Sequence, residues 1–335
     1  MIITPEIANL FGLKPGLEAY DNSTLATIDS CVRKAYWKLL FPLPGSGGTS
    51  GVADRVGIAA HFGSSIHSAM DKFHSPVLYH SATYDKRKLV AFKAFSQEYY
   101  NLIPDHDMVD EPYTHTTGLR MLADYFDHFQ AEDGFFIPIE TELCIIIYIP
   151  ELNCYWISRT DGLIARPAMH DTLVREFKTT KSSLQNKIDE LRISRQPQGY
   201  VWSARQPEFQ GPNDKPITGF MADVLAVRVR EKDPNKLFQR DIFHVNPVQE
   251  EQWYRETVIK ITRWREIQRL ANISAAEVSP LFQHHFFDRN TNECLRYRKC
   301  SFYELCINGP SNTDLQKFLP NDWNPLHAGT PAEIA

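Results

Sequence analysis

The sequence predicts an α/β protein, because two blocks of the chain carry different hydrophobic periods. From His67 to about Phe129, apolar residues recur at helical spacing, which is typical of several amphipathic helices. Between Phe135 and Thr180 the pattern changes to alternating β-branched and aromatic residues separated by turn residues, which is typical of β-hairpins. The 335 residues, 43% of them hydrophobic, are enough to bury one large core or two modest ones.

The N-terminal part of the chain is predicted to be a helix followed by a loop. The segment from Ser23 to Leu40 looks helical and carries Cys31 among basic and aromatic residues. The glycine- and proline-rich segment PLPGSGGTSG follows it and is predicted to be a flexible loop.

Three strands are expected in the alternating block, at roughly Pro138 to Ile149, Tyr155 to Ala165 and Thr172 to Thr180. The short sequences PELN and PAMH join them and have the composition of turns. The three strands would therefore form two consecutive hairpins.

The second half of the chain alternates helix and strand. A helix is expected from Ser183 to about Arg205, with Pro197 as a candidate break or kink. A strand from Gly219 to Val229 and an amphipathic helix from Pro247 to Leu270 follow. After a cysteine-rich segment, the residues from about Ser311 have the composition of a loosely held tail.

Composition and charge narrow the class of protein. The formal net charge of -5 argues against a surface that binds nucleic acid everywhere, but it allows a local basic groove. The N-terminal sequence shows no basic region followed by an apolar run, so no secretory signal is expected. The most apolar stretch, Leu143 to Ile149, is far shorter than the ~20 residues of a membrane-spanning helix. We therefore expect a cytoplasmic protein that does not contact a membrane.

Hairpin geometry predicts which strand residues face each other. If Pro150 to Asn153 is a four-residue loop, Glu142 faces Asp161 on the next strand. If Pro167 to His170 is also a four-residue loop, Asp161 faces Glu176. Three carboxylates would then lie side by side on one face of the sheet, because side chains alternate with a period of two.

Lys178 would share that face, two residues after Glu176. Like charges directly opposite each other destabilise a sheet, so the row indicates that a positive group lies between them. A hard divalent cation with oxygen ligands is the natural candidate. The alternative is that Asp161 and Glu176 are solvated strand residues, and a one-residue slip in register would break the row.

The string RTDGLIARPAMHDTLVREFKTTK resembles the D…ExK core of the PD-(D/E)XK nucleases. Asp161 stands at the position of the aspartate, and Glu176, Phe177 and Lys178 stand at ExK. The proline of the family name is Thr160 here, a departure that also occurs in RecB-like members.

Two further elements resemble the RecB-like branch of this family. HFGSSIHSAMDKF is similar to its GxxxH element, with Gly63 and His67 in those positions and His61 as a competing histidine. Gln196 and Tyr200 fit its QxxxY element, and their i, i+4 spacing places them on one helical face. The elements occur in the order of the branch, and this order supports the resemblance more than any single element does.

The resemblance implies a restriction-endonuclease-like core, a mixed central sheet flanked by helices, with a helical insertion. It implies a hydrolase that cleaves DNA with Mg²⁺ or Mn²⁺, held by His67, Asp161, Glu176 and the carbonyl of Phe177. Lys178 would orient or help to deprotonate the attacking water. Single-strand exonuclease activity is favoured over endonuclease activity.

Other residues have supporting roles in this hypothesis. Glu142 would help to position Lys178 or the attacking water, and Gln196 and Tyr200 would contact the strand near the metal ions. Basic and aromatic residues mix in RKAYWK, in LRYRK and near the basic run from Lys86 to Lys88, a combination that suits phosphates and stacked single-stranded bases. Such mixtures also occur on ordinary solvated surfaces.

The six cysteines of a chain without an export signal are expected to be reduced thiols or metal ligands. Cys294, Cys300 and Cys306 are six residues apart, so on one unbroken helix they would point in different directions. A four-thiolate site needs one more ligand, and Cys31 is the best candidate. Cys144 and Cys154 fall in the strand region and are expected to be packing residues.

The stretch CVRKAYW resembles the N-terminal cysteine element of iron-sulfur RecB-like nucleases, such as the CRISPR-associated exonucleases and AddB-type nuclease domains. This resemblance implies a [4Fe-4S] cluster bound by Cys31, Cys294, Cys300 and Cys306. The gap from Cys294 to Cys300 is longer than the two-residue gap common in those families. Zinc is the alternative metal, and unligated buried cysteines are the remaining alternative.

We expect a single nuclease domain and a tail. The expected ranges are 1–310 for the domain, 20–45 and 285–310 for the iron-sulfur closure, 68–132 for the helical block, 135–230 for the catalytic core and 311–335 for the tail. The partner is DNA, single-stranded or with free ends. No GxxxxGK[ST] loop is present, so unwinding would require a helicase, recombination or CRISPR partner protein.

Two alternatives from other classes remain. The first is a catalytically inactive DNA-binding or assembly module. The second is a four-cysteine zinc scaffold with unrelated chemistry.

Overall fold

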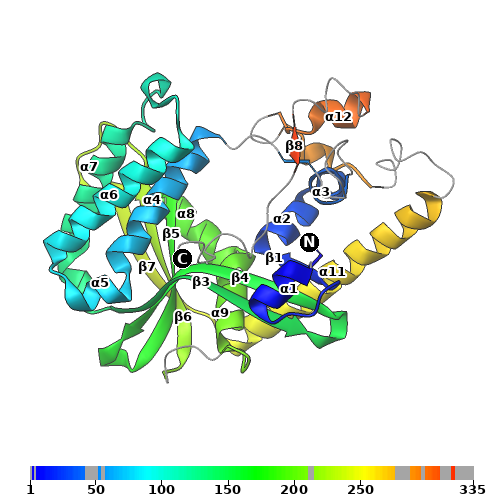
Figure 1. Ribbon diagram of the computed structural model, residues 1–335, viewed down its shortest axis with the longest axis horizontal. Helices are drawn as coiled ribbons and strands as arrows, with labels where there is room; N and C mark the ends of the chain where they lie inside the picture. Colours follow the sequence, from blue (N-terminus) through cyan, green and yellow to red (C-terminus); the bar gives the residue numbers. More distant parts are fainter. Residues whose placement is uncertain are drawn as a thin grey trace. The chain divides into compact units, whose positions relative to one another are not determined.

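The computed structural model describes residues 2–3, 5–41, 52–53, 57–209, 215–275, 287–295, 299–309 and 318–320. The chain divides into two compact units. Unit 1 comprises Met1–Arg55, Tyr148–Ile157 and Tyr254–Ala335, and unit 2 comprises Val56–Ile147 and Ser158–Trp253. Figure 1 shows the course of the chain through both units.

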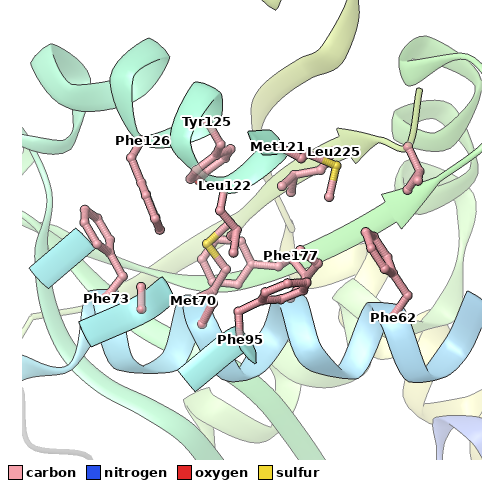
Figure 2. Packing of buried hydrophobic residues seen from close by; sticks show 14 of the residues in the cluster. Phe62, Met70, Phe73, Phe95, Met121, Leu122, Tyr125, Phe126, Phe177 and Leu225 are labelled. Carbon is pink, nitrogen blue, oxygen red and sulfur yellow. The ribbon is translucent and has the colours of Figure 1, made fainter. Parts of the chain in front are cut away.

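The helical block of unit 2 consists of α4 (Ile58–His74), α5 (Pro76–Ser81), α6 (Tyr84–Leu102) and α7 (His115–Asp133). A short 3₁₀ turn, His106–Met108, lies between α6 and α7. The apolar stripes of α4, α6 and α7 meet in one buried cluster, as the helical spacing predicts. Figure 2 shows the labelled members Phe62, Met70, Phe73, Phe95, Met121, Leu122, Tyr125, Phe126, Phe177 and Leu225. Because the last two belong to the sheet, this cluster fixes the helices to one face of it.

Five strands of the six-stranded central sheet are β3 (Ile137–Ile149), β4 (Cys154–Arg166), β5 (Asp171–Thr180), β6 (Ile217–Ala226) and β7 (Phe238–His244), and the sixth is β1 (Glu18–Asp21). β3 pairs with β4, and β4 is antiparallel to β5. β5 is parallel to β6, which is antiparallel to β7. The prediction of an α/β fold with a mixed sheet flanked by helices is therefore confirmed, and it fits a restriction-endonuclease-like core.

The two hairpin loops have the four residues that the sequence predicts. Each begins with a proline that opens a 3₁₀ turn and ends with a residue in the left-handed region, Asn153 (φ 48°) and His170 (φ 53°). On β4 and β5 the pairing runs from Arg166–Asp171 to Gly162–Arg175, which is the predicted register. The boundaries of these three strands agree with the prediction to within one residue.

The helix predicted from Ser183 to about Arg205, with Pro197 as a candidate break, is broken at Ser194. Two helices are present, α8 (Leu184–Ile193) and α9 (Arg195–Arg205), and Ser194 between them is extended (ψ 157°). Pro197 has no N–H to donate to the carbonyl of Ile193, and its ring would clash with that carbonyl in a continuous helix. The helix therefore breaks three residues before the proline instead of at it.

Strand β6 is shorter than predicted, and strand β7 was not predicted. β6 ends at Ala226, so the predicted extension to Val229 is wrong. β7 was not expected, because Arg240 and Asp241 interrupt the alternation of its apolar residues. A one-turn helix, α10 (Pro234–Leu237), leads into β7.

Strands β5, β6 and β7 are joined by buried charged side chains. Asp223 on β6 is fully buried and accepts hydrogen bonds from Arg175 Nε at 2.9 Å and from Arg240 Nε at 2.7 Å. Both guanidinium groups also donate to the hydroxyl of Tyr125, and Arg240 donates to Asp133 at 2.9 Å. Burial alone would raise the pKa of Asp223, but Arg240 and Arg175 outweigh burial and lower it.

Replacing Asp223 with asparagine should destabilise the fold by about 3–5 kcal/mol at neutral pH, because buried Arg175 then has no carboxylate partner and Arg240 keeps only Asp133 and Glu132. Since the folded pKa of Asp223 is lowered, its contribution is present above the unfolded pKa of about 3.9 and is lost as the pH falls through the folded value. The difference between the two proteins should therefore shrink below about pH 4. Urea unfolding of wild type and Asp223→Asn across pH 3–7 measures this; equal stability at pH 7 would contradict it.

Unit 1 begins with α1 (Pro5–Phe11), β1 (Glu18–Asp21), α2 (Asn22–Ser30) and α3 (Val32–Leu39). β1 runs parallel to the first residues of β4, from Glu18–Cys154 to Asp21–Ile157. The continuous helix predicted from Ser23 to Leu40 is wrong, because Cys31 is extended (φ -167°, ψ 118°) and separates α2 from α3.

The rest of unit 1 is mainly the C-terminal part of the chain. The long helix α11 (Pro247–Ala275) starts where predicted and extends five residues further, and its part from Tyr254 belongs to unit 1. A 3₁₀ turn at Thr291–Glu293 and helix α12 (Tyr303–Asn308) follow. Two short strands, β2 (Val52–Ala53) and β8 (Leu319–Pro320), pair antiparallel.

The predicted loop from Pro42 to Gly51 lies outside the described residues, as does most of the predicted tail after Ser311. Within the described part of the chain, no helix combines the length and the apolar character needed to cross a membrane.

Candidate metal centre

The side chain of Asp161 contacts both helix α4 and strand β5. His67 lies in the middle of α4, nine residues after its start, and not at a helix start as the sequence suggested. Its Nδ1 is 2.9 Å from Oδ1 of Asp161 on β4. The other oxygen, Oδ2, accepts a hydrogen bond from the backbone N–H of Phe177 at 2.6 Å. Asp161 is thus fixed between α4 and the ExK segment.

Glu142 on β3 joins this pair. One ligand atom each from His67, Glu142 and Asp161 lie within 4.8 Å of one another, and no other such group of three occurs among the described residues. Arg159, two residues before Asp161 on β4, donates to Glu142 Oε2 at 3.2 Å. Glu142 itself has a positive φ of 49°, a conformation that non-glycine residues seldom adopt inside a strand.

Glu176 is buried beside this group, with 3% of its surface exposed. Its Oε1 forms an ion pair with Lys178 and accepts a hydrogen bond from Nε2 of Gln196 at 2.9 Å. The same amide nitrogen lies 2.8 Å from the hydroxyl of Tyr200, as expected for two residues on one face of α9. The second oxygen of Glu176, Oε2, is buried and has no hydrogen-bond partner.

The carboxylates repel one another in a site whose side chains are only partly exposed to solvent. Burial, followed by the charge of Asp161, raises the pKa of Glu142 to about 7. Burial and Asp161 likewise raise the pKa of Glu176 to about 7, although Lys178 opposes this shift. Burial would also raise the pKa of Asp161, but His67 outweighs burial and lowers it.

The residues present fit a divalent cation. Carboxylate oxygens are the preferred ligands of Mg²⁺ and Mn²⁺, and imidazole is compatible with Mn²⁺. A cation would compensate the charges that raise the pKa values of Glu142 and Glu176. The buried and unpartnered Oε2 of Glu176 is a free ligand position next to Asp161. His61, the competing histidine, is not part of this group.

Glu142, Asp161 and Glu176 thus lie near one another on β3, β4 and β5, and His67, Lys178, Gln196 and Tyr200 are close to them. Arg159 was not singled out in the sequence. Its signal was available, because residues two apart on a strand point to the same face. The positive φ of Glu142 left no signal in the sequence.

The cysteine group belongs to unit 1. Sγ of Cys31 lies 3.4 Å from the backbone nitrogen of Asn290, which donates to it, and Sγ of Cys294 lies 3.6 Å from the carbonyl oxygen of the same residue. The N–H of Cys300 donates to the carbonyl of Cys294 at 2.8 Å. Burial raises the pKa of the Cys306 thiol, and the nearby thiols of Cys31 and Cys300 add to this shift.

The four cysteines Cys31, Cys294, Cys300 and Cys306 fit a metal ion or cluster that is bound by four thiolates. All four cysteines are free thiols, and they come from segments more than 250 residues apart. Arg33 lies close enough to Cys31 and Cys306 to interact with their charge, and its Nε donates to the carbonyl of Phe287 at 2.7 Å. At Cys306 the charge of Arg33 opposes the effect of burial and favours the thiolate form that binds metal. Cys144 and Cys154 lie instead on β3 and β4, and burial raises the pKa of each to about 11.

Comparison with known proteins gives a family match. A model of the PD-(D/E)XK nuclease superfamily matches residues 22–307, a range that contains both the metal centre and the cysteine group. The chain is also similar in fold to a crystal structure of a "putative exonuclease" from Eubacterium rectale, with a TM-score of 0.47 and 12% sequence identity over 90% of this chain and 94% of that chain. No curated protein matches the chain.

Proposed function

Because the chain belongs to the PD-(D/E)XK nuclease superfamily, we propose that it is a metal-dependent deoxyribonuclease that degrades single-stranded DNA from an end. The observation that carries this proposal is the geometry around Asp161. One of its oxygens contacts His67, the other contacts the amide of Phe177, and Glu142 and Glu176 lie beside it. The proximity of His67 on α4 to the carboxylates of neighbouring strands supports the proposal.

His67, Asp161, Glu176 and the carbonyl of Phe177 would hold Mg²⁺ or Mn²⁺, with Glu142 as a further oxygen ligand. The cation would supply Lewis-acid stabilisation of the negative charge that develops on the phosphate. Burial would lower the pKa of Lys178, but Glu176 and Asp161 outweigh burial and raise it. From this position the Lys178 ammonium would orient the attacking water by donating a hydrogen bond to it. Gln196 holds Glu176 in place, and Tyr200 in turn is within hydrogen-bond distance of Gln196.

The second part of the proposal is a [4Fe-4S] cluster bound by Cys31, Cys294, Cys300 and Cys306. The contacts of Cys31 and Cys294 with Asn290 support it, because they bring the N-terminal and C-terminal segments of unit 1 to one place. The cluster would tie the α2–α3 break to the segment before α12, closing a loop of more than 250 residues. This would place the chain in the iron-sulfur branch that includes CRISPR-associated and AddB-type nucleases.

Repair, recombination, phage DNA processing and CRISPR adaptation are the biological contexts that match the proposed exonuclease activity.

A pair of DNA substrates tests the proposed activity. Purified protein is incubated with end-labelled linear single strands and with circular single strands, each with Mg²⁺, with Mn²⁺ or with EDTA. We expect shortening of the linear strand with either metal, no cleavage of the circle and no reaction in EDTA. Nicking of the circle would overturn the exonuclease assignment, and cleavage only of duplex DNA would overturn the strand preference.

A further inference from the structure

A second feature of unit 2 is a pocket of about 530 Å³. The start of α4, the segment between α6 and α7, and Lys181 directly after β5 line it. Its side chains include His61 and Tyr113, together with the carboxylates of Asp105 and Asp110. None of these residues contributes to the metal centre.

The pocket lies where α4 and β5 lead away from the centre. From Lys178 to Lys181 the chain covers about 10 Å at ~3.3 Å per strand residue. From His67 back to His61, α4 covers about 9 Å at ~1.5 Å per residue. The two elements stay in contact on the way, since a Cβ added to Gly63 would lie 3.3 Å from Oγ1 of Thr179. About 10 Å corresponds to up to three nucleotides of a stacked strand at ~3.4 Å each.

Tyr113 gives the pocket an aromatic surface with a cation beside it. Nζ of Lys181 lies 4.2 Å from the centroid of the Tyr113 ring. The ring packs against Phe62 with centroids 5.5 Å apart, and the backbone oxygen of Tyr113 accepts a hydrogen bond from the hydroxyl of Tyr99 at 2.9 Å. In the part of the chain that the structure describes, exposed Lys181 forms no ion pair. A fixed ring with a movable lysine is the combination that binds a stacked base and its phosphate.

The acidic side chains of the pocket decide which part of a nucleotide enters it. The carboxylates of Asp105 and Asp110 are exposed, while that of Glu111 accepts hydrogen bonds from the hydroxyl groups of Thr114 and Thr117. Carboxylates repel phosphate but accept hydrogen bonds from the amino groups of bases. The pocket therefore suits a nucleobase, with the phosphate kept on the side of Lys181.

We propose that this pocket binds one nucleobase of the DNA strand, within three nucleotides of the scissile phosphate. Tyr113 stacks on the base, and Lys181 contacts the neighbouring phosphate. The inference rests on the proposed nuclease function and adds a base contact to it. The strand would then also be held at a nucleotide within three positions of the one that is cut.

The test measures binding of fluorescein-labelled single-stranded oligonucleotides by anisotropy in Mg²⁺, using the Lys178→Ala protein to prevent cleavage. An abasic site is moved along the strand one position at a time. We expect one position at which loss of the base weakens binding by about tenfold. The protein that carries both Lys178→Ala and Tyr113→Leu should bind the intact strand about tenfold more weakly, and the abasic site should then have no further effect.

Matched variants separate the proposal from general damage. Lys181→Gln should weaken binding of every strand. The slope of log binding constant against log salt concentration should fall by about one, because one phosphate contact is lost. Tyr113→Phe, which keeps the ring, should retain the abasic effect. Tyr79→Leu and Lys93→Gln, which replace the same residue types outside the pocket, should bind every strand as the parent protein does.

Two results would overturn the base pocket while leaving the nuclease intact. One is an abasic penalty of the same size with and without Tyr113→Leu. The other is equal binding of all abasic strands by the parent protein. Failure of the nuclease proposal looks different, because the wild-type protein would then leave the linear strand uncut in both metals.

Discussion

Replacement of Lys178 by alanine is expected to lower the rate of DNA cleavage by about 10²–10³-fold, the range for loss of one positioned hydrogen-bond donor in an active site. Lys178 is the cation paired with Glu176, and its ammonium interacts with the charge of Asp161 as well. No other lysine or arginine among the described residues forms an ion pair with either carboxylate. Single-turnover cleavage of an end-labelled single strand in Mg²⁺ measures the rate.

The control for this variant is Lys187→Ala. Lys187 lies on α8 and pairs with Glu190 at 2.8 Å, so its loss removes a lysine of similar exposure without touching the metal centre. It should cut at the wild-type rate. Both variants should keep the wild-type circular dichroism spectrum. Cleavage at the wild-type rate by Lys178→Ala would remove Lys178 from the catalytic group.

Replacement of Cys31 by serine is expected to abolish the absorbance of an anaerobic preparation near 400 nm (roughly the region of iron-sulfur thiolate bands) and to reduce the bound iron. Serine lacks the thiolate that binds iron, and the remaining ligands all lie in the segment after Asp288. The thermal midpoint should fall as well, because the N-terminal helices lose their link to that segment.

Cys144→Ser is the matched control, since Cys144 lies on β3 and is not one of the four cysteines of the group. It should retain both colour and iron. A colourless wild-type preparation that contains zinc would show that the four thiols bind zinc instead of a cluster. A wild-type preparation without either metal would contradict the four-thiolate site altogether.

The strands were predictable because their turns carry strong local signals. Proline opens each hairpin loop, and Asn153 and His170 close the loops in the left-handed region, so the register followed from the loop length. The break at Ser194 was harder to place, because the constraint comes from Pro197 but acts on the carbonyl four residues earlier. β7 was missed because Arg240 is buried against Asp223, a tertiary contact that the local pattern does not record.

The site was predictable to the extent that it depends on strand alternation. Glu142, Asp161 and Glu176 could be aligned from the two hairpins, whereas the 2.9 Å contact of His67 with Asp161 depends on how α4 packs across the sheet. Only the ordered family elements pointed to that histidine. The unpartnered oxygen of Glu176 likewise arises from tertiary burial.

The most direct test of the metal centre compares Mn²⁺ binding and DNA cleavage in one preparation freed of metal with EDTA. Calorimetric titration gives the binding curve, and single-strand cleavage is measured at the same Mn²⁺ concentrations for wild type and for Asp161→Asn. We predict that wild-type cleavage rises in parallel with Mn²⁺ binding and that Asp161→Asn loses both. Undiminished Mn²⁺ binding and cleavage by Asp161→Asn, or wild-type cleavage that persists in EDTA, would contradict the account.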